Sequence, residues 1–167
     1  HSGIPDRKGS MLSNDLSSFE QSQFYFEKDN SFTDKGLEVS LPAWHLFDDE
    51  LFIYERKEME RAFSDRFLLG DASVPLYSPV SIRIKVEEED VPFDKMIIIR
   101  SYKGREYANP TEVNGDYLEC SSKRFGEFYV LCDTVPPMVR SYDFKKSMKG
   151  RSKFSFKVAD DLAGIET

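Results

Sequence analysis

Apolar residues recur at every second position in several short stretches of this chain, which is the period of a β-strand with one buried face. Three such stretches cover 37–41, 80–86 and 128–132. Pro42 ends the first of them, because proline cannot donate a hydrogen bond to a neighbouring strand. The regularity of these stretches predicts a protein built mainly from β-strands.

Other local patterns support the same fold class. Met96–Ile99 is continuously apolar, which predicts a central strand covered on both faces. Asn114-Gly115 is a hairpin signal, and Lys103–Arg105 supplies another turn. About seven or eight short strands with turns about every 8 to 12 residues, and no βαβ rhythm, predict an all-β antiparallel sandwich of the immunoglobulin-like kind.

One stretch, 55–69, allows two interpretations. It is rich in charge and could form a short helix with Met59 and Phe63 on one face. It could equally be an exposed loop between strands, because it holds few apolar residues. After it, Pro75 and Pro79 indicate irregular chain.

The pattern divides the chain into three parts. Residues 1–19 are polar and serine-rich and form a leader or connecting segment, and residues 20–134 form the β-sandwich domain. Pro136 and Pro137 then make a stiff joint. Alternating apolar residues resume within 135–167, which we expect to be the start of a second, incomplete immunoglobulin-like domain, since a full one needs about 100 residues.

Composition restricts the partners. The hydrophobic content of 40% and aromatic content of 14% suffice for a core. The net charge of −7 with a pI near 5.0 argues against nucleic acid or an anionic membrane surface as a partner. No run approaches the roughly 18 apolar residues of a membrane-spanning helix, so we expect no membrane insertion.

Two cysteines, Cys120 and Cys132, flank the turn at Phe125-Gly126. If that turn makes a hairpin, the two residues lie nearly opposite each other. They are then either two buried thiols or a cross-strand disulfide, and a disulfide requires an oxidising compartment and suitable geometry.

Catalytic patterns are not found in the sequence. Its two histidines are His1 and His45, and they form no H-x-x-x-D, H-x-H or H-E-x-x-H spacing. There is also no G-x-S-x-G and no phosphate-binding glycine loop. We therefore predict that this chain is not an enzyme, has no catalytic, cofactor-binding or metal-binding residues, and uses His45 structurally.

Acidic and aromatic residues suggest two further kinds of site, each with a simpler explanation. Asp48–Glu50 and Glu87–Asp90 could bind calcium but fit solvated strand ends better, because neither has the spacing of a calcium loop. The aspartates around the joint could also bind calcium, but capping of turns explains them equally simply; they are Asp133, Asp143, Asp160 and Asp161. Six aromatic residues could form a sugar-binding platform or fill the core: Trp44, Tyr54, Tyr77, Tyr102, Tyr107 and Tyr117.

Seven segments resemble a known protein family. They are Phe26–Phe32, Leu37–Ala43, Phe47–Asp49, Tyr77–Val80, Arg124–Phe128, Asp133–Pro137 and Asp160–Ile165. Together they resemble the non-catalytic C-terminal β-sandwich and immunoglobulin-like region of lysostaphin-type (LytM-like) zinc metallopeptidases of Bacteroidetes. In that family an upstream domain holds zinc through an H-x-x-x-D and an H-x-H pair and cuts peptidoglycan cross-links.

The resemblance implies an accessory role in the periplasm or cell envelope. The chain would position or regulate the catalytic domain of its parent protein, and peptidoglycan or an envelope protein would be a further partner. Zinc is expected only in that catalytic domain, so no cofactor is expected in this chain. The first residues of the chain remain unmatched.

Two other functions compete with this one. The aromatic and acidic content also fits a stand-alone, adhesin-like sandwich that binds glycans or proteins in the envelope. In addition, Gly36–Pro42 resembles the opening of the ZU5 type of β-domain found in scaffolding and autoprocessing proteins. Autoprocessing needs a serine or threonine nucleophile beside a base, and no histidine-serine pair of that sort is present, so this comes third.

Overall fold

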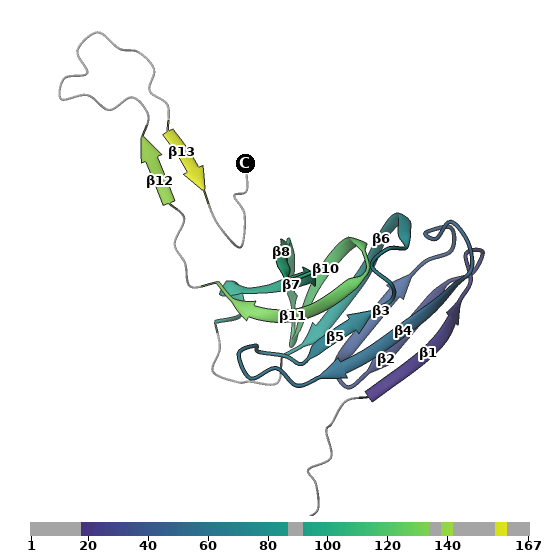
Figure 1. The fold of residues 1–167 in the computed structure, drawn as a ribbon. Helices are drawn as coiled ribbons and strands as arrows, with labels where there is room; N and C mark the ends of the chain where they lie inside the picture. Colours follow the sequence, from purple (N-terminus) through teal and green to yellow (C-terminus); the bar gives the residue numbers. More distant parts are fainter. Residues whose placement is uncertain (1–17, 87–91, 134–137, 142–155, 160–167) are drawn as a thin grey trace, which may run out of the picture.

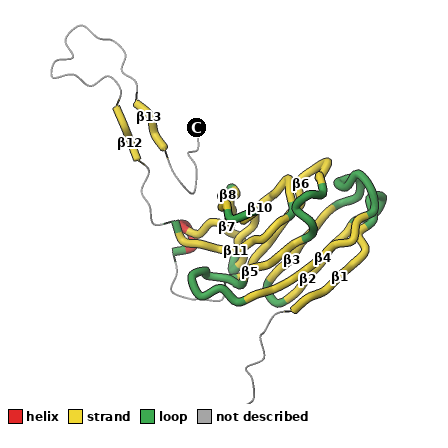
Figure 2. Tube along the Cα trace, in the orientation of Figure 1, coloured by secondary structure: helices red, strands yellow, loops and turns green. Residues whose placement is uncertain are grey.

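Two antiparallel sheets lie face to face in the computed structural model and enclose a hydrophobic core (Figure 1). The structure describes residues 18–86, 92–133, 138–141 and 156–159. Strands make up almost all of the regular structure in this part of the chain (Figure 2), together with the short 3-10 turn η1 (Phe93–Lys95). The predicted all-β antiparallel sandwich is confirmed, while its immunoglobulin-like character stays a prediction.

The six-stranded sheet has the order β1-β4-β5-β11-β7-β8. Its strands are β1 (Ser18–Phe24), β4 (Glu50–Lys57), β5 (Arg66–Leu69), β7 (Met96–Tyr102), β8 (Arg105–Asn109) and β11 (Gly126–Cys132). The five-stranded sheet has the order β2-β3-β6-β10-β9. Its strands are β2 (Asn30–Asp34), β3 (Leu37–Leu41), β6 (Pro75–Lys85), β9 (Thr111–Asn114) and β10 (Tyr117–Arg124).

The core lies where the alternating apolar residues of the two sheets meet. On β3 and β6, Val39 and Ile82 are paired in register and are at most 2% exposed. The six-stranded sheet contributes Phe52, Phe128 and Val130 from β4 and β11 to the same cluster. These four strands therefore turn one face inward, as a period of two predicts.

Strand β7 is covered on both faces, as its continuous apolar sequence predicted. Ile98 points into the main core, whereas Ile97 and Ile99 form a second cluster with Tyr129 on the outer face of the six-stranded sheet. The chain between β4 and β5 (58–65) covers that second cluster with partly buried side chains. The outer cover is thus a loop rather than a helix.

The stretch 55–69 contains no helix. β4 continues to Lys57, a loop follows, and β5 occupies Arg66–Leu69. The sequence did not predict β5, because a strand of four residues leaves too short a pattern to recognise. The irregular chain expected at Pro75 and Pro79 is wrong: Pro75 is the first residue of β6 and Pro79 lies within it. The pairing of β6 with β10 shifts register between Pro75 and Val80, and a strand start or a bulge is where a sheet tolerates proline.

The turn at Phe125-Gly126 does not form a hairpin within one sheet. β10 belongs to the five-stranded sheet and β11 to the six-stranded sheet, so the chain crosses the core at this point. Phe125 is 2% exposed, and its burial between the sheets accounts for the crossing. Cys120 and Cys132 consequently lie in different sheets, and both are free thiols in this structure. The hairpin expectation was wrong, and with it the basis for a disulfide between these cysteines.

A small separate sheet follows the sandwich in sequence. β12 (Met138–Ser141) pairs antiparallel with β13 (Phe156–Ala159). The expected return of strand character after the joint agrees with this pair. Pro136-Pro137 and the turn at Asp160–Ile165 lie outside the described residues, and a second immunoglobulin-like domain stays a prediction. At the other boundary β1 begins at Ser18, so the last two residues of the expected leader segment (1–19) belong to β1.

Candidate functional site

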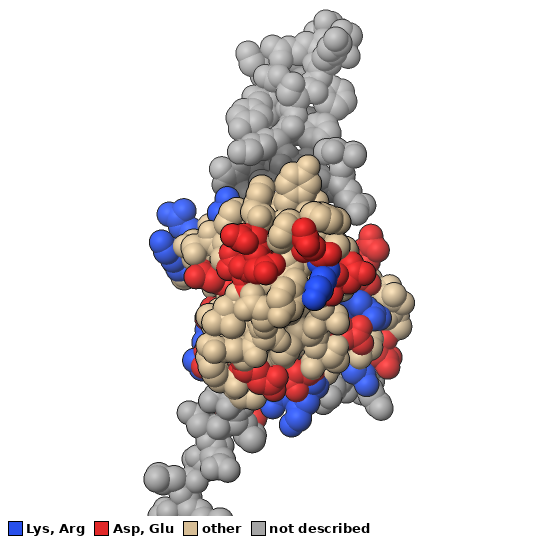
Figure 3. Space-filling model, turned by 90° about the vertical axis from the view of Figure 1, so that its right-hand side faces the viewer, with Lys and Arg blue, Asp and Glu red and all other residues tan. Residues whose placement is uncertain are grey.

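One end of the sandwich exposes large aromatic side chains. Trp44 is 59% exposed, Phe47 is 62% exposed and Tyr77 is 71% exposed. They come from the loop between β3 and β4 and from the first residues of β6, with Phe26 of the β1–β2 turn beside them. We call Phe26, Trp44, Phe47 and Tyr77 the aromatic end. Figure 3 views the molecule from the side where these loops lie, and uncharged side chains fill much of the middle of that face.

The aromatic rings are packed in two pairs. Phe26 and Trp44 meet edge to face, with ring centroids 5.4 Å apart and planes at 82°. Phe47 and Tyr77 meet in the same way at 5.7 Å and 83°. Edge-to-face pairs of this kind are favourable because the positive edge of one ring faces the negative face of the other. Each exposed ring is therefore packed against a neighbouring ring.

The loop that carries Trp44 is fixed to the sandwich by its backbone. The Trp44 N–H donates to the Phe26 carbonyl at 2.6 Å, and the Tyr77 N–H donates to the His45 carbonyl at 2.8 Å. Leu46 is 3% exposed and anchors the loop in the core. Trp44 itself has a φ of 68°, a left-handed conformation that is uncommon for a bulky residue and is retained only where the surroundings enforce it.

Acidic side chains complete the attachment of these loops. Asp29 accepts a hydrogen bond from the Ala43 N–H at 2.9 Å, and Asp49 accepts one from the Phe26 N–H at 2.9 Å. The cluster Asp48–Glu50 therefore helps to hold two loops together at the start of β4. Glu87–Asp90, Asp143, Asp160 and Asp161 lie outside the described residues. In the part of the chain that the structure describes, no three potential metal ligands converge.

His45 lies within this loop and has a structural contact. Its Nδ1 atom lies 3.1 Å from the carbonyl oxygen of Pro79, which fits an N–H donor that ties the loop to β6. The side chain is half-buried. This geometry agrees with the structural histidine that the sequence predicted.

The six aromatic residues singled out in the sequence do not form one platform. Tyr54 is fully buried in the core, whereas Trp44 and Tyr77 are both exposed at the aromatic end. The other three lie on different strands, each beneath a cation: Tyr102 under Lys103, Tyr107 under Arg100 and Tyr117 under Arg83. Sequence reasoning missed Phe26 and Phe47. The signal for Phe47 was the group of large apolar residues Trp44, Leu46 and Phe47, which follows Pro42 and belongs to no alternating stretch.

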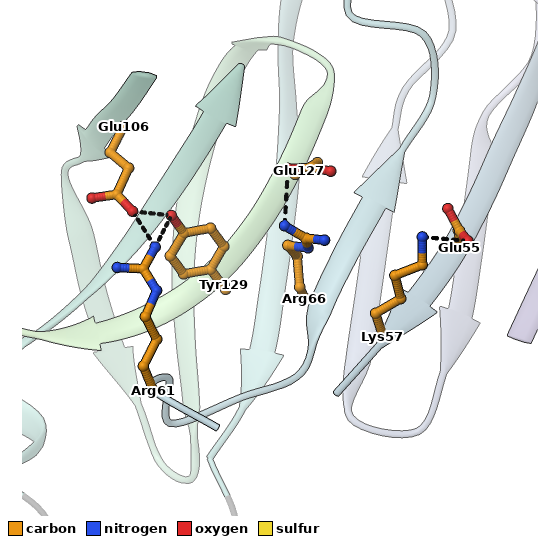
Figure 4. A network of polar contacts seen from close by, with 7 residues as sticks. All are labelled: Glu55, Lys57, Arg61, Arg66, Glu106, Glu127 and Tyr129. Atoms are coloured by element: carbon orange, nitrogen blue, oxygen red, sulfur yellow. Dashed lines mark hydrogen bonds and ion pairs between the residues drawn. The ribbon is translucent and has the colours of Figure 1, made fainter. Parts of the chain in front are cut away.

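A polar network on the outer face of the six-stranded sheet holds the 58–65 loop (Figure 4). Tyr129 and Arg61 both donate to the same oxygen of Glu106. Burial, followed by the contact with Glu106, raises the pKa of Tyr129 to about 12. The hydrogen bond from Tyr129, followed by that from Arg61, lowers the pKa of Glu106. This arrangement keeps Glu106 ionised and Tyr129 protonated, so these groups attach the 58–65 loop to the sheet rather than exchange a proton.

The opposite end of the sandwich has a pocket of about 480 Å³ between the sheets. Arg56 lines it and is 9% exposed, with Nε 3.6 Å from Asp65. Tyr54 donates to Asp34 at 2.6 Å, and burial together with this carboxylate raises the pKa of Tyr54 far above its usual value. Arg56 therefore lies between two carboxylates, Asp34 at 4.0 Å and Asp65 at 3.6 Å.

The described sandwich coincides with a known domain family. Residues 21–133 match the family model of the Zu5-like domain. The chain belongs to the Zu5-like domain family. No curated protein matches it. In this Zu5-like domain, the segment Gly36–Pro42 that resembles a ZU5-type opening forms β3 together with one residue on either side of it. The resemblance to lysostaphin-type peptidases stays a prediction. Among the described residues, no helix is long and apolar enough to span a membrane.

Proposed function

We propose that this chain is a non-catalytic accessory region of a cell-envelope zinc metallopeptidase that acts on peptidoglycan. Its Zu5-like domain would position or regulate a catalytic domain located elsewhere in the parent protein, in the periplasm or at the cell envelope. Zinc and the residues that hold it would belong to that catalytic domain. The described residues of this chain would contribute a rigid surface.

The observation that carries the proposal is where the family-like segments lie. Four segments that resemble the accessory region are far apart in sequence: 26–32, 37–43, 47–49 and 77–80. Two hydrogen bonds and a ring contact join them at one end of the sandwich: Asp29 with Ala43, Asp49 with Phe26, and the ring of Phe47 with that of Tyr77. Segments that resemble a family separately are thus parts of one structural unit.

The test uses the isolated chain. After dialysis against zinc and then buffer, metal analysis should find no stoichiometric zinc, and labelled peptidoglycan incubated with the chain should release no soluble label. The parent protein, or an established zinc endopeptidase, serves as the positive control. Stoichiometric zinc together with peptidoglycan hydrolysis by the isolated chain would contradict the proposal.

A second candidate function is a stand-alone envelope module that binds glycans or proteins. The specific observation in its favour is the exposure of Trp44, Phe47 and Tyr77, since large exposed apolar groups mark interaction surfaces. A glycan array and a pull-down with purified cell-wall material separate it from the first candidate. Saturable binding by the isolated chain, without any catalytic partner, would favour this function, and flat responses in both assays would count against it.

A further inference from the structure

We propose that the aromatic end is a docking surface for a basic polypeptide segment. The segment would place apolar groups against Trp44 and Tyr77 and cationic groups against the carboxylates of the neighbouring loops. This inference rests on the second candidate function and names its partner class. It depends only on the described surface and not on the identity of the parent protein.

The first argument is the preorganisation of the surface. Trp44 and Tyr77 are among the most exposed aromatic residues of the described chain, yet each is paired with another ring. Trp and Tyr dominate binding energy at protein interfaces because they bury large areas and lose little side-chain entropy on binding. Here the loop itself also needs little ordering on binding, because backbone hydrogen bonds fix the Trp44 loop to Phe26 and to β6.

The second argument is charge. The β1–β2 turn and the β3–β4 loop expose four carboxylates, Glu27, Asp29, Asp48 and Asp49, against one cation, Lys28. Lys28 lies over the ring of Tyr25, with Nζ 4.6 Å from the ring centroid. Figure 3 shows carboxylate patches beside the uncharged middle of this face. The surface therefore selects a positively charged partner by complementarity.

Lysine and arginine side chains combine the two features that this surface offers. Their long apolar stems pack against aromatic rings, and their charged heads reach nearby carboxylates or lie over a ring face. Lys123 and Arg124 lie on the other side of β6, where Arg124 is paired with Pro75. Basic residues of the partner would consequently lie on the β3 side of Tyr77 and not on the β10 side.

The experiment measures binding of fluorescent twelve-residue peptides to the complete chain by anisotropy. One peptide alternates lysine and leucine, a second alternates glutamate and leucine, and a third alternates lysine and serine. We expect saturable binding of the lysine–leucine peptide alone, weakened as salt rises from about 0.05 to about 0.5 M. Backbone amide shifts in the NMR spectrum should change in the loops 25–29 and 42–49.

Two kinds of variant locate the site. The double variant Trp44→Ala/Tyr77→Ala should weaken binding at least about tenfold, whereas Tyr107→Ala, a matched exposed tyrosine on β8, should leave it unchanged. Glu27→Lys should weaken binding about threefold and reduce its salt dependence. Circular dichroism of each variant controls for folding, and Glu27→Lys keeps the test valid if the double variant unfolds.

Three outcomes would overturn the inference. One is equal binding of the glutamate–leucine peptide. Another is binding that Tyr107→Ala weakens as much as the double variant. The third is saturable binding of cell-wall glycan at Trp44 and Tyr77 with no binding of the lysine–leucine peptide. That third result would contradict a polypeptide partner but keep a binding function for the chain. Failure of this inference can therefore be told apart from failure of the second candidate function.

Discussion

Gly70 lies where β5 ends and the chain turns toward β6. It has a φ of 59°, and a Cβ atom placed on it would lie 2.6 Å from the ring of Phe125. Phe125 is the residue at which the chain crosses from one sheet to the other. A single glycine therefore makes room for the side chain that fills this crossing.

Gly70→Ala should destabilise the fold by about 2–4 kcal/mol, because it combines a left-handed backbone with a clash inside the core. Gly115→Ala is the matched control: Gly115 has a φ of 63°, but no atom lies within 4 Å of its Cβ position. Its cost should be about 1 kcal/mol, from the backbone alone. Urea unfolding measures both, and equal costs would show that the contact with Phe125 does not matter.

Cys120 should make the stability depend on alkaline pH. Burial, with a smaller effect of Glu119, raises the pKa of its thiol from 9.0 to about 12. The folded state thus holds a proton that the unfolded state releases above pH 9, so this contribution is complete below pH 9 and is lost as pH rises toward 12. The free energy of unfolding should fall over this range, and that of the Cys120→Ala variant should fall less steeply. Parallel curves for the two proteins would contradict this account.

The 58–65 loop acts as a structural element although it has no regular secondary structure. β5 pairs with β11 only along residues 126–128. Beyond them, the 58–65 loop lies beside β11 in place of β5. The Phe63 N–H donates to the Val130 carbonyl, and the Val130 N–H donates to Ser64 Oγ. Local pattern could predict β3, β6 and β7, because the alternation of β3 and β6 and the apolar run of β7 lie in their own residues. It could not predict β5 or this loop, whose positions depend on a distant strand.

Ser64→Ala should destabilise the fold by about 1–3 kcal/mol, because it leaves the Val130 N–H without its acceptor. Amide hydrogen exchange should quicken at Val130. Ser73→Ala is the control: Ser73 bonds only locally, to Asp71, in an exposed loop. We expect little change in Val130 exchange there. An unchanged Val130 exchange rate in Ser64→Ala would show that the loop does not complete the sheet.

The whole molecule depends on how the strands are assigned to the two sheets. Alternation predicts that a residue faces the core but does not say which sheet its strand joins, and for this reason the sequence allowed a hairpin at the β10–β11 connection. The same limit applies to Trp44 and Tyr77: aromatic residues fill cores and form surfaces, and only the position of the loop decides between the two. The family match places the domain among Zu5-like sandwiches but does not determine what the aromatic end binds.

The two thiols provide a test of the crossing. Because Cys120 and Cys132 lie in different sheets and both are free, oxidation of the folded chain with a glutathione mixture should leave two titratable thiols after denaturation. Intact mass should correspond to the reduced chain. A mass lower by two hydrogens, with no dimer on a non-reducing gel, would show that the two sulfur atoms come within bonding distance and would contradict the positions of Cys120 and Cys132 in this structure.

The central claim is that this Zu5-like domain serves a zinc peptidase of the cell envelope. The measurement that tests it most directly is the sequence of the parent gene on the 5′ side of the codon for His1. We expect it to encode a domain with an H-x-x-x-D followed by an H-x-H, the ligands of a lysostaphin-type zinc site. A parent gene that encodes only further β-domains, with no such ligands, would contradict the accessory role and leave binding through the aromatic end as the function.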